Sequence, residues 1–150
     1  MQSRHAVSAG LVQGAFDEGA LRSRLEEARS VLAGGRCDLA MVFVTPSLLD
    51  SAREVLELVQ VHARAPLLVG CSGPGVIGNG LEAEDGPAVA FGLLRLPGAR
   101  LSAVHFRGDE VEDAQGPASW HGLTGVEPGE SRGWLVFADP YSVDAELWVE

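Results

Sequence analysis

The amino-acid sequence predicts an α/β domain with a mixed β-sheet and flanking helices, and three observations indicate this class. First, strand-length apolar runs alternate with amphipathic helical patterns over residues 5–70, as in a β-α-β-α-β unit with crossover connections. Second, Asn79-Gly80 stands between apolar residues, which is a strong hairpin-turn signal. Third, Pro97-Gly98 separates two further strand patterns, which predicts an antiparallel pair.

The first helix is expected between two strands. Small residues at 5–10 favour a short strand, and Asp17 or Glu18 can begin the helix that follows. Its apolar face has residues three and four positions apart: Leu21, Leu25, Ala28 and Leu32. Gly34-Gly35 follows the last turn, where glycine commonly ends a helix. The nearly continuous apolar run 38–44 then predicts a strand that is buried on both faces.

A second helix is expected after the break at Thr45-Pro46-Ser47. Ser47 is the predicted N-cap, and Asp50 completes an approximate capping box. The predicted buried stripe of this helix consists of apolar residues at helical spacing: Leu48, Ala52, Val55, Leu56 and Val59. Residues 64–66 end the helix, and a third strand follows at 67–70.

The remaining strands are expected to be antiparallel. Residues 87–96 form a strand pattern, and the alternating segment 100–106 should pair with it, which makes His105 a sheet residue. The polar segment 108–132 predicts irregular structure with one short helix at 117–120. A last strand is expected at 133–138, followed by a helix that Ser142 or Asp144 could cap.

Composition favours one folded domain over residues 1–150 and argues against several functions. The chain is 46% hydrophobic and carries a net charge of −10, and all eleven of its cations are arginine. Such acidity disfavours nucleic acid and anionic membranes as partners. The start of the chain lacks the pattern of a signal peptide, so we expect a cytoplasmic location without a structural disulfide. Two cysteines and four scattered histidines give no zinc spacing, and we expect neither a metal nor a cofactor.

A glycine-dense segment follows the third strand and contains Cys71. Its backbone N–H groups could approach a ligand together with Cys71 and Ser72, or it could be a tight turn with a buried cysteine. A catalytic thiol would need a base, and none of the histidines stands at a telling spacing. The formal G-x-G-x-x-G match at 73–78 is not expected to bind a nucleotide, because Pro74 and the turn at 79–80 favour hairpin geometry over a following helix.

Small polar residues follow three of the predicted strands. If the strands that precede Thr45, Cys71 and Asp139 are parallel neighbours, their carboxyl ends meet in one crevice, where open α/β sheets place ligands. The candidate ligand-binding residues are Thr45, Ser47, Cys71, Ser72, Gly73, Gly75, Asp139 and Ser142. Helix capping is the alternative role for Ser47, Asp139 and Ser142. The acidic cluster Glu82, Glu84 and Asp85 could hold a cation or lie in a solvated loop.

Several segments in this order resemble the N-terminal domain of FIST proteins, whose name refers to F-box and intracellular signal transduction. They are residues 38–47, 68–78, Glu82 with 86–89, 96–98 and 138–142, and the Gly-Cys-Ser segment is the most specific of them. The resemblance spans residues 8 to 142. It implies a sensory module that binds small ligands such as amino acids. Family members normally continue into a C-terminal FIST half, so we expect this chain to be C-terminally truncated relative to the family.

Three functional readings stay open at this point. The first is a non-catalytic signal-transduction domain that senses a small ligand, such as an amino acid. The second is a thiol-dependent enzyme that uses Cys71. The third is a protein-interaction platform that docks a C-terminal FIST half or a signalling partner.

Overall fold

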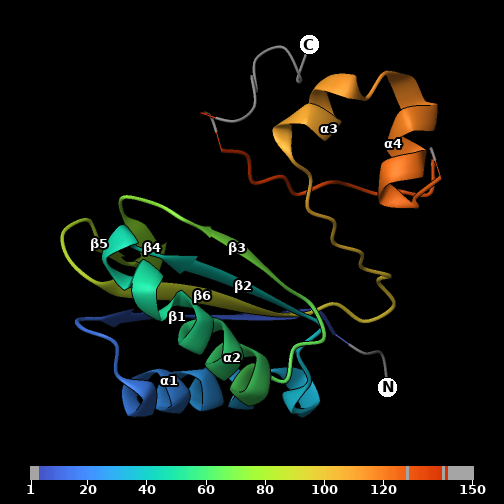
Figure 1. Cartoon of the computed structure of the whole chain (residues 1–150). Coiled ribbons are helices and arrows are strands. Elements are labelled where there is room, and N and C mark those ends of the chain that lie inside the picture. The colour runs from blue at the N-terminus through green and yellow to red at the C-terminus, as the bar shows by residue number, and fades with distance from the viewer. Residues whose placement is uncertain (1–3, 128, 140, 142–150) are drawn as a thin grey trace. The chain divides into compact units, whose positions relative to one another are not determined.

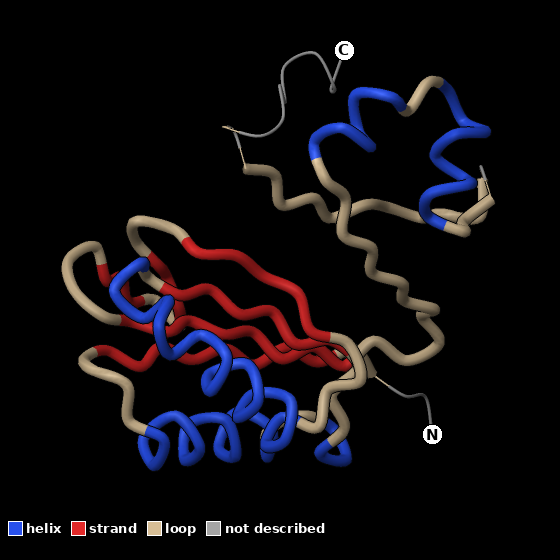
Figure 2. Tube along the Cα trace, viewed as in Figure 1, coloured by secondary structure: helices blue, strands red, loops and turns tan. Residues whose placement is uncertain are grey.

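The computed structural model describes residues 4–127, 129–139 and 141, and the chain divides into two compact units after Leu101. The first unit contains the β-sheets and the two long helices (Figures 1 and 2). The second unit contains two short helices, α3 (Gly108–Asp113) and α4 (Gly116–Thr124). In the described part of the chain, no helix combines the length and the apolar character needed to cross a bilayer.

The main sheet of the first unit is mixed, as the sequence predicts. Its four strands lie in the order β1 (Ala6–Gln13), β6 (Ala88–Arg95), β2 (Leu39–Val44) and β3 (Leu68–Ser72). Strands β2 and β3 are parallel neighbours, whereas β6 runs antiparallel to both β1 and β2. The fold class is therefore confirmed, and β6 is inserted between the first two strands of the chain.

Both long helices, α1 (Glu18–Ser30) and α2 (Ala52–Ala63), cover the same face of this sheet (Figure 1). Asp17 is the N-cap of α1, and its Oδ1 accepts a hydrogen bond from the Ala20 N–H at 2.9 Å, as predicted. The helix ends at Ser30, and the two glycines that follow it lie in a 3-10 turn, η1 (Ala33–Gly35).

The predicted N-cap of the second helix is wrong. A 3-10 helix, η2 (Pro46–Ser51), intervenes, so Ser47 lies within η2 and α2 is preceded by Ser51. Pro46 fits the first turn of η2, where its missing N–H is not needed. Leu56 is also wrongly predicted to be buried, since 41% of it is exposed on the outer side of α2.

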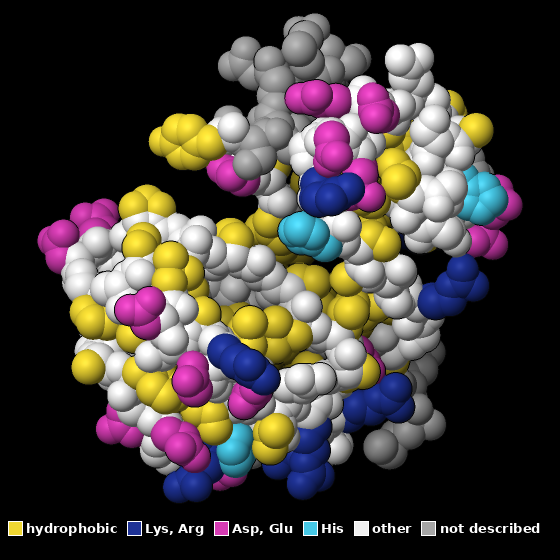
Figure 3. Space-filling view, viewed as in Figure 1, with side chains coloured by type: hydrophobic (Ala, Val, Ile, Leu, Met, Phe, Trp, Pro, Cys, Tyr) yellow, Lys and Arg dark blue, Asp and Glu magenta, His cyan; other side chains and the backbone are white. Residues whose placement is uncertain are grey.

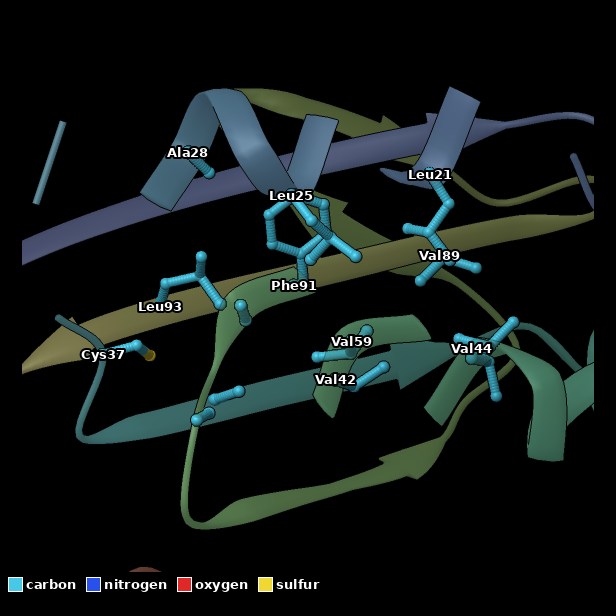
Figure 4. Close-up of a cluster of buried hydrophobic side chains, with 14 of the residues drawn as sticks. Leu21, Leu25, Ala28, Cys37, Val42, Val44, Val59, Val89, Phe91 and Leu93 are labelled. Atoms are coloured by element: carbon cyan, nitrogen blue, oxygen red, sulfur yellow. The ribbon is translucent and has the colours of Figure 1, made fainter. Parts of the chain in front are cut away.

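The main hydrophobic core lies between the two helices and the sheet (Figure 4). Leu21 and Leu25 of α1 pack toward alternate residues of β6, and Val59 of α2 packs toward β2. Gly10 of β1 stands opposite Phe91 in the register, and the Phe91 ring occupies the space that a Cβ on Gly10 would need. The core side chains contributed by the two strands are Ala40, Val42, Val44, Val89, Phe91 and Leu93.

A hairpin covers part of the opposite sheet face. It consists of β4 (Val76–Gly78) and β5 (Leu81–Ala83), which pair antiparallel across the predicted Asn-Gly turn. Asn79 and Gly80 have φ values of 53° and 75°, the left-handed conformation that this two-residue turn requires. Val76 and Ala83 of the hairpin form a second, smaller core with three buried residues of the main sheet, Leu11, Ala88 and Ala90.

Two predicted strands are absent from the described residues. Segment 100–106 does not pair with β6, because β1 and β2 already occupy both edges of that strand, and His105 is therefore not a sheet residue. Segment 133–138 is also not a strand, and Trp134 and Leu135 are 61% and 60% exposed. The helix predicted at 117–120 is confirmed within α4, where Trp120 packs edge-on against Phe106. The helix expected after residue 142 lies outside the described residues.

Candidate functional site

The carboxyl ends of β2 and β3 bring five of the predicted site residues into one region: Thr45, Ser47, Cys71, Ser72 and Gly73. The two strands are parallel and in register, with Phe43 opposite Cys71 and Val44 opposite Ser72. The Gly73 N–H donates a hydrogen bond to the Val44 carbonyl at 3.0 Å, which extends the pairing past the end of β3. Thr45 directly follows Val44, which is the register partner of Ser72, so Thr45 and Ser72 lie at the same edge of the sheet, as expected for parallel neighbours.

Thr45 is buried and hydrogen-bonded within the fold. Only 1% of the residue is exposed, and its Oγ1 accepts a hydrogen bond from the Ala88 N–H at 2.9 Å. Its backbone N–H donates to the Ala88 carbonyl at 3.0 Å, and its Oγ1 lies 3.1 Å from the Ser47 Oγ. Thr45 thus completes the pairing of β2 with β6 and positions the exposed Ser47 at the start of η2.

Cys71 is a free and exposed thiol on the edge strand β3. Cys37 is also free but buried, its thiol donates to the Leu39 carbonyl at 3.1 Å, and burial raises its pKa. Two histidines in the described part of the chain have side-chain partners, and in both cases the partner is a glutamate and not Cys71. His62 lies 3.0 Å from Glu26, and His121 lies 3.5 Å from Glu127. The accessible thiol at this site is therefore Cys71, and no described histidine is hydrogen-bonded to it.

The glycines of this segment allow close approach of backbone to backbone. A Cβ on Gly70 would collide with the Val42 carbonyl oxygen, so β3 can lie this close to β2 only with glycine there. A Cβ on Gly75 would lie 3.2 Å from the Ala83 carbonyl oxygen of the hairpin. The G-x-G-x-x-G match is followed by strand β5 and not by a helix, so it lacks the geometry of a dinucleotide-binding turn.

Two of the predicted site residues are not brought to these strand ends by a parallel strand. Asp139 follows segment 133–138, which is not a strand, so the expectation that three parallel strands converge is wrong. The Asp139 Oδ1 accepts a hydrogen bond from the Tyr141 N–H at 3.0 Å in a local turn of the second unit. Ser142 lies outside the described residues.

Carboxylates cluster at the same end of the first unit. Asp17 and Glu18 begin α1 there, Asp50 lies in η2, and Glu82, Glu84 and Asp85 lie on β5 and the loop that follows it. The Glu84 Cα would lie 3.4 Å from a Cβ on Gly75, so this carboxylate belongs to the immediate surroundings of the glycine segment. Figure 3 shows acidic side chains over the hairpin end of the sheet, at the left of the view. No group of three metal-ligating side chains occurs among the described residues. These carboxylates therefore contribute a negative electrostatic potential at this end of the sheet and do not form a metal site.

The sequence drew attention to three of these carboxylates but not to the others. Glu82, Glu84 and Asp85 are adjacent in the chain and were recognisable as a cluster. Asp17 and Asp50 are distant in the chain, and they join the cluster because each lies just after a strand that ends at this edge. Acidic residues favour helix starts because of the helix dipole, and this signal could have linked them.

Comparisons with known proteins agree with this architecture. The family model described as the FIST N domain matches residues 38–150. The uncharacterized proteins MT0656 and Rv0628c, from two strains of Mycobacterium tuberculosis, are each 32% identical to this chain over 125 residues. The matched segment covers 82% of this chain but 30% of each of these proteins. The chain therefore spans about a third of the length of the relatives that it matches.

Proposed function

Because the chain belongs to the FIST N domain family, we propose that it is a non-catalytic signal-transduction domain that senses a small ligand with a cationic amine, such as an amino acid. The observation that carries this proposal is the position of three exposed residues, Ser47, Cys71 and Ser72, at the carboxyl ends of the parallel neighbours β2 and β3. Exposed side chains that donate and accept hydrogen bonds lie there on a rigid scaffold, the arrangement in which open α/β sheets hold ligands.

The surrounding charge supports an amine-bearing ligand. Asp50, Glu82, Glu84 and Asp85 lie around these strand ends, and an ammonium group is attracted by such a field, whereas an anionic ligand is repelled. The hydroxyls of Ser47 and Ser72 would orient the polar part of the ligand. The cytoplasmic location predicted from the sequence belongs to the same proposal.

A thermal-shift screen of the whole chain tests the proposal. Amino acids and amines are compared with carboxylic acids of the same carbon skeleton. A ligand at about a hundred times its Kd should add about 2.7 kcal/mol to the free energy of unfolding, which raises Tm by several degrees. We expect dose-dependent shifts from amine-bearing compounds only. Shifts from the carboxylic acids alone would contradict the ligand class, and no shift from any compound would contradict the sensor function of this chain.

Two variants locate the site. Ser47→Ala and Cys71→Ala should each reduce the ligand-induced shift, and Ser23→Ala on the exposed surface of α1 is the matched control. The other two readings stay predictions, and the same variants separate them. A thiol-dependent enzyme would lose turnover in Cys71→Ala, whereas a platform that docks a C-terminal FIST half or a signalling partner would keep its binding.

A further inference from the structure

The turn between β4 and β5 contains the one asparagine of the chain. Asn79 directly precedes Gly80, and both residues are exposed. An asparagine that precedes a glycine is chemically labile, because the backbone nitrogen of the glycine can attack the side-chain Cγ of the asparagine. Glycine hinders this attack less than any other residue, since it has no Cβ. The turn that the hairpin requires is therefore also a reactive pair of residues.

Few contacts hold this pair in its present geometry. Among the described residues, neither the side-chain amide of Asn79 nor the N–H of Gly80 has a hydrogen-bond partner. A Cβ on Gly80 would meet nothing within 4 Å beyond its chain neighbours. The side chains of Ile77 and Leu81, on either side of the turn, are 74% and 59% exposed. The tip of the hairpin is thus accessible to water and weakly packed.

The packing of the hairpin is concentrated at the end away from the turn. Val76 and Ala83 form the pair farthest from the turn, and they are 5% and 6% exposed in the second core. The tip can therefore open locally while this pair stays packed, and such opening costs little where few apolar contacts are lost. Opening releases Asn79 from its left-handed conformation, with a φ of 53°, and gives its side chain the freedom to meet the Gly80 nitrogen.

We propose that Asn79 is a modification site, at which the side-chain amide is converted without an enzyme, through a cyclic succinimide, to aspartate or isoaspartate. The Gly80 nitrogen forms a bond to the Asn79 Cγ and gives up its proton, and the side-chain nitrogen leaves as ammonia. Water then opens the ring. Attack of water on the Cγ restores the original main chain and leaves aspartate, whereas attack on the backbone carbonyl carbon of residue 79 leaves isoaspartate.

The two products affect the hairpin differently. Asp-Gly supports the same two-residue turn as Asn-Gly, so the aspartate product changes only the charge. The isoaspartate product leads the main chain through the side-chain carbon, and the longer turn no longer matches the pairing of β4 with β5. Val76 and Ala83 are then held less firmly against the sheet. Either product adds a negative charge close to the cluster of Glu82, Glu84 and Asp85.

Intact-mass spectrometry of the whole chain tests the proposal, during incubation at physiological temperature and at neutral and alkaline pH. We expect a growing fraction with the mass gain of an amide converted to an acid. Growth should be faster at alkaline pH, because the Gly80 nitrogen attacks in its deprotonated form. Asn79→Gly is the matched control, since Gly-Gly also fits this turn, and it should gain no mass. Asp85-Gly86 can form the same ring, but it returns to an acid of unchanged mass.

Two further measurements test the structural part of the proposal. The rate in the folded protein should lie within about a hundredfold of the rate in urea, because the tip opens without global unfolding. The isoaspartate form, separated by ion exchange, should unfold several degrees below the fresh protein, whereas freshly prepared Asn79→Asp should stay within about 2 °C of it.

Three outcomes would overturn the proposal. An equal mass gain in Asn79→Gly would assign the lost amide to a glutamine. A mass that stays constant in the folded protein but rises in urea would mean that the native turn protects Asn79. An isoaspartate form as stable as the fresh protein would mean that the hairpin does not depend on the length of this turn.

Discussion

Asp38 connects three segments of the chain through one carboxylate. Its Oδ2 accepts a hydrogen bond from the Leu96 N–H at 2.7 Å, and its Oδ1 accepts one from the Arg36 Nε at 3.0 Å. The hydrogen bond from Leu96 and the Arg36 guanidinium lower the pKa of Asp38, although partial burial acts in the opposite direction. The carboxylate therefore fixes the chain where it leaves β6 against the start of β2.

Asp38→Asn should destabilise the protein by about 2 kcal/mol at pH 7, because a charge-assisted hydrogen bond to a backbone N–H is lost. A group whose pKa is lowered by folding stabilises the fold above its unfolded pKa of about 3.9, and this contribution disappears as the pH falls through the folded value. The difference in the free energy of unfolding between wild type and variant should thus be constant from pH 7 to about 5 and shrink below about 4. Urea denaturation at each pH measures it, and a difference that grows on acidification would contradict the assignment.

Gly70 and Gly92 both lie in strands of the main sheet, but the space available for a Cβ atom differs between them, so they can be compared by substitution. An alanine Cβ at Gly70 would collide with the Val42 carbonyl oxygen, whereas one at Gly92 would meet its nearest neighbours, Met41 and Leu94, at 4.0 Å. We expect Gly70→Ala to destabilise the fold by more than about 3 kcal/mol, since the obstacle is backbone and β3 must move away from β2. Gly92→Ala should change the stability by less than about 1 kcal/mol. Comparable losses in chemical denaturation of the two variants would show that the pairing of β2 with β3 is not this close.

At the scale of elements, Thr45 joins the end of β2 to the beginning of β6. Thr45→Val keeps the shape of the side chain but leaves the buried Ala88 N–H without its 2.9 Å acceptor. A loss of about 1–3 kcal/mol in the free energy of unfolding is expected. Ser47→Ala removes a neighbouring hydroxyl that is exposed, and it should cost less than about 0.5 kcal/mol. If Thr45→Val were as stable as wild type, the hydrogen bond between the Thr45 hydroxyl and the Ala88 N–H would not stabilise the fold, and the hydroxyl would be available to bind a ligand in the wild-type protein.

Local patterns predicted the elements of the first unit better than their pairing. The Asn-Gly turn of β4 and β5, the Asp17 cap and the apolar run of β2 each depend on residues close in the chain. The insertion of β6 between β1 and β2 depends on pairs of residues that are 45 (Val44 and Val89) to 89 (Ala6 and Arg95) positions apart, and no local pattern encodes it. This insertion is why segment 100–106 has no place beside β6. The alternation at 100–106 and the apolar run at 133–138 both have strand propensity. Neither segment has a neighbouring strand to pair with in the structure, so neither forms a strand.

The candidate site was predictable to the extent that it depends on parallel neighbours. Residues after β2 and β3 meet because the α2 crossover makes those strands parallel, which the alternation of strand and helix predicted. Asp139 was included because its segment has the composition of a strand, and composition does not specify pairing. The burial of Thr45 was equally invisible in the sequence, because its partner Ala88 is 43 residues away.

At the scale of the whole molecule, the net charge of −10 lowers the free energy of unfolding through repulsion between like charges. Glu82, Glu84 and Asp85 lie close together after the hairpin turn, and repulsion among such carboxylates destabilises the compact state at low ionic strength. Raising sodium chloride from about 20 to about 300 mM shortens the Debye length from about 20 Å to about 6 Å. We therefore expect Tm to rise by a few degrees over this range.

The double variant Glu84→Gln/Asp85→Asn separates this local repulsion from general salt effects. It should raise Tm at about 20 mM salt and reduce the further gain at about 300 mM, because both changes remove the same repulsion. Differential scanning fluorimetry of the two proteins across the salt series measures both quantities. A double variant whose Tm rises with salt as steeply as that of wild type would place the repulsion elsewhere in the chain. The same variant should also bind an amine-bearing ligand less tightly. The removal of these two charges would therefore raise the stability of the protein and lower its affinity for the ligand.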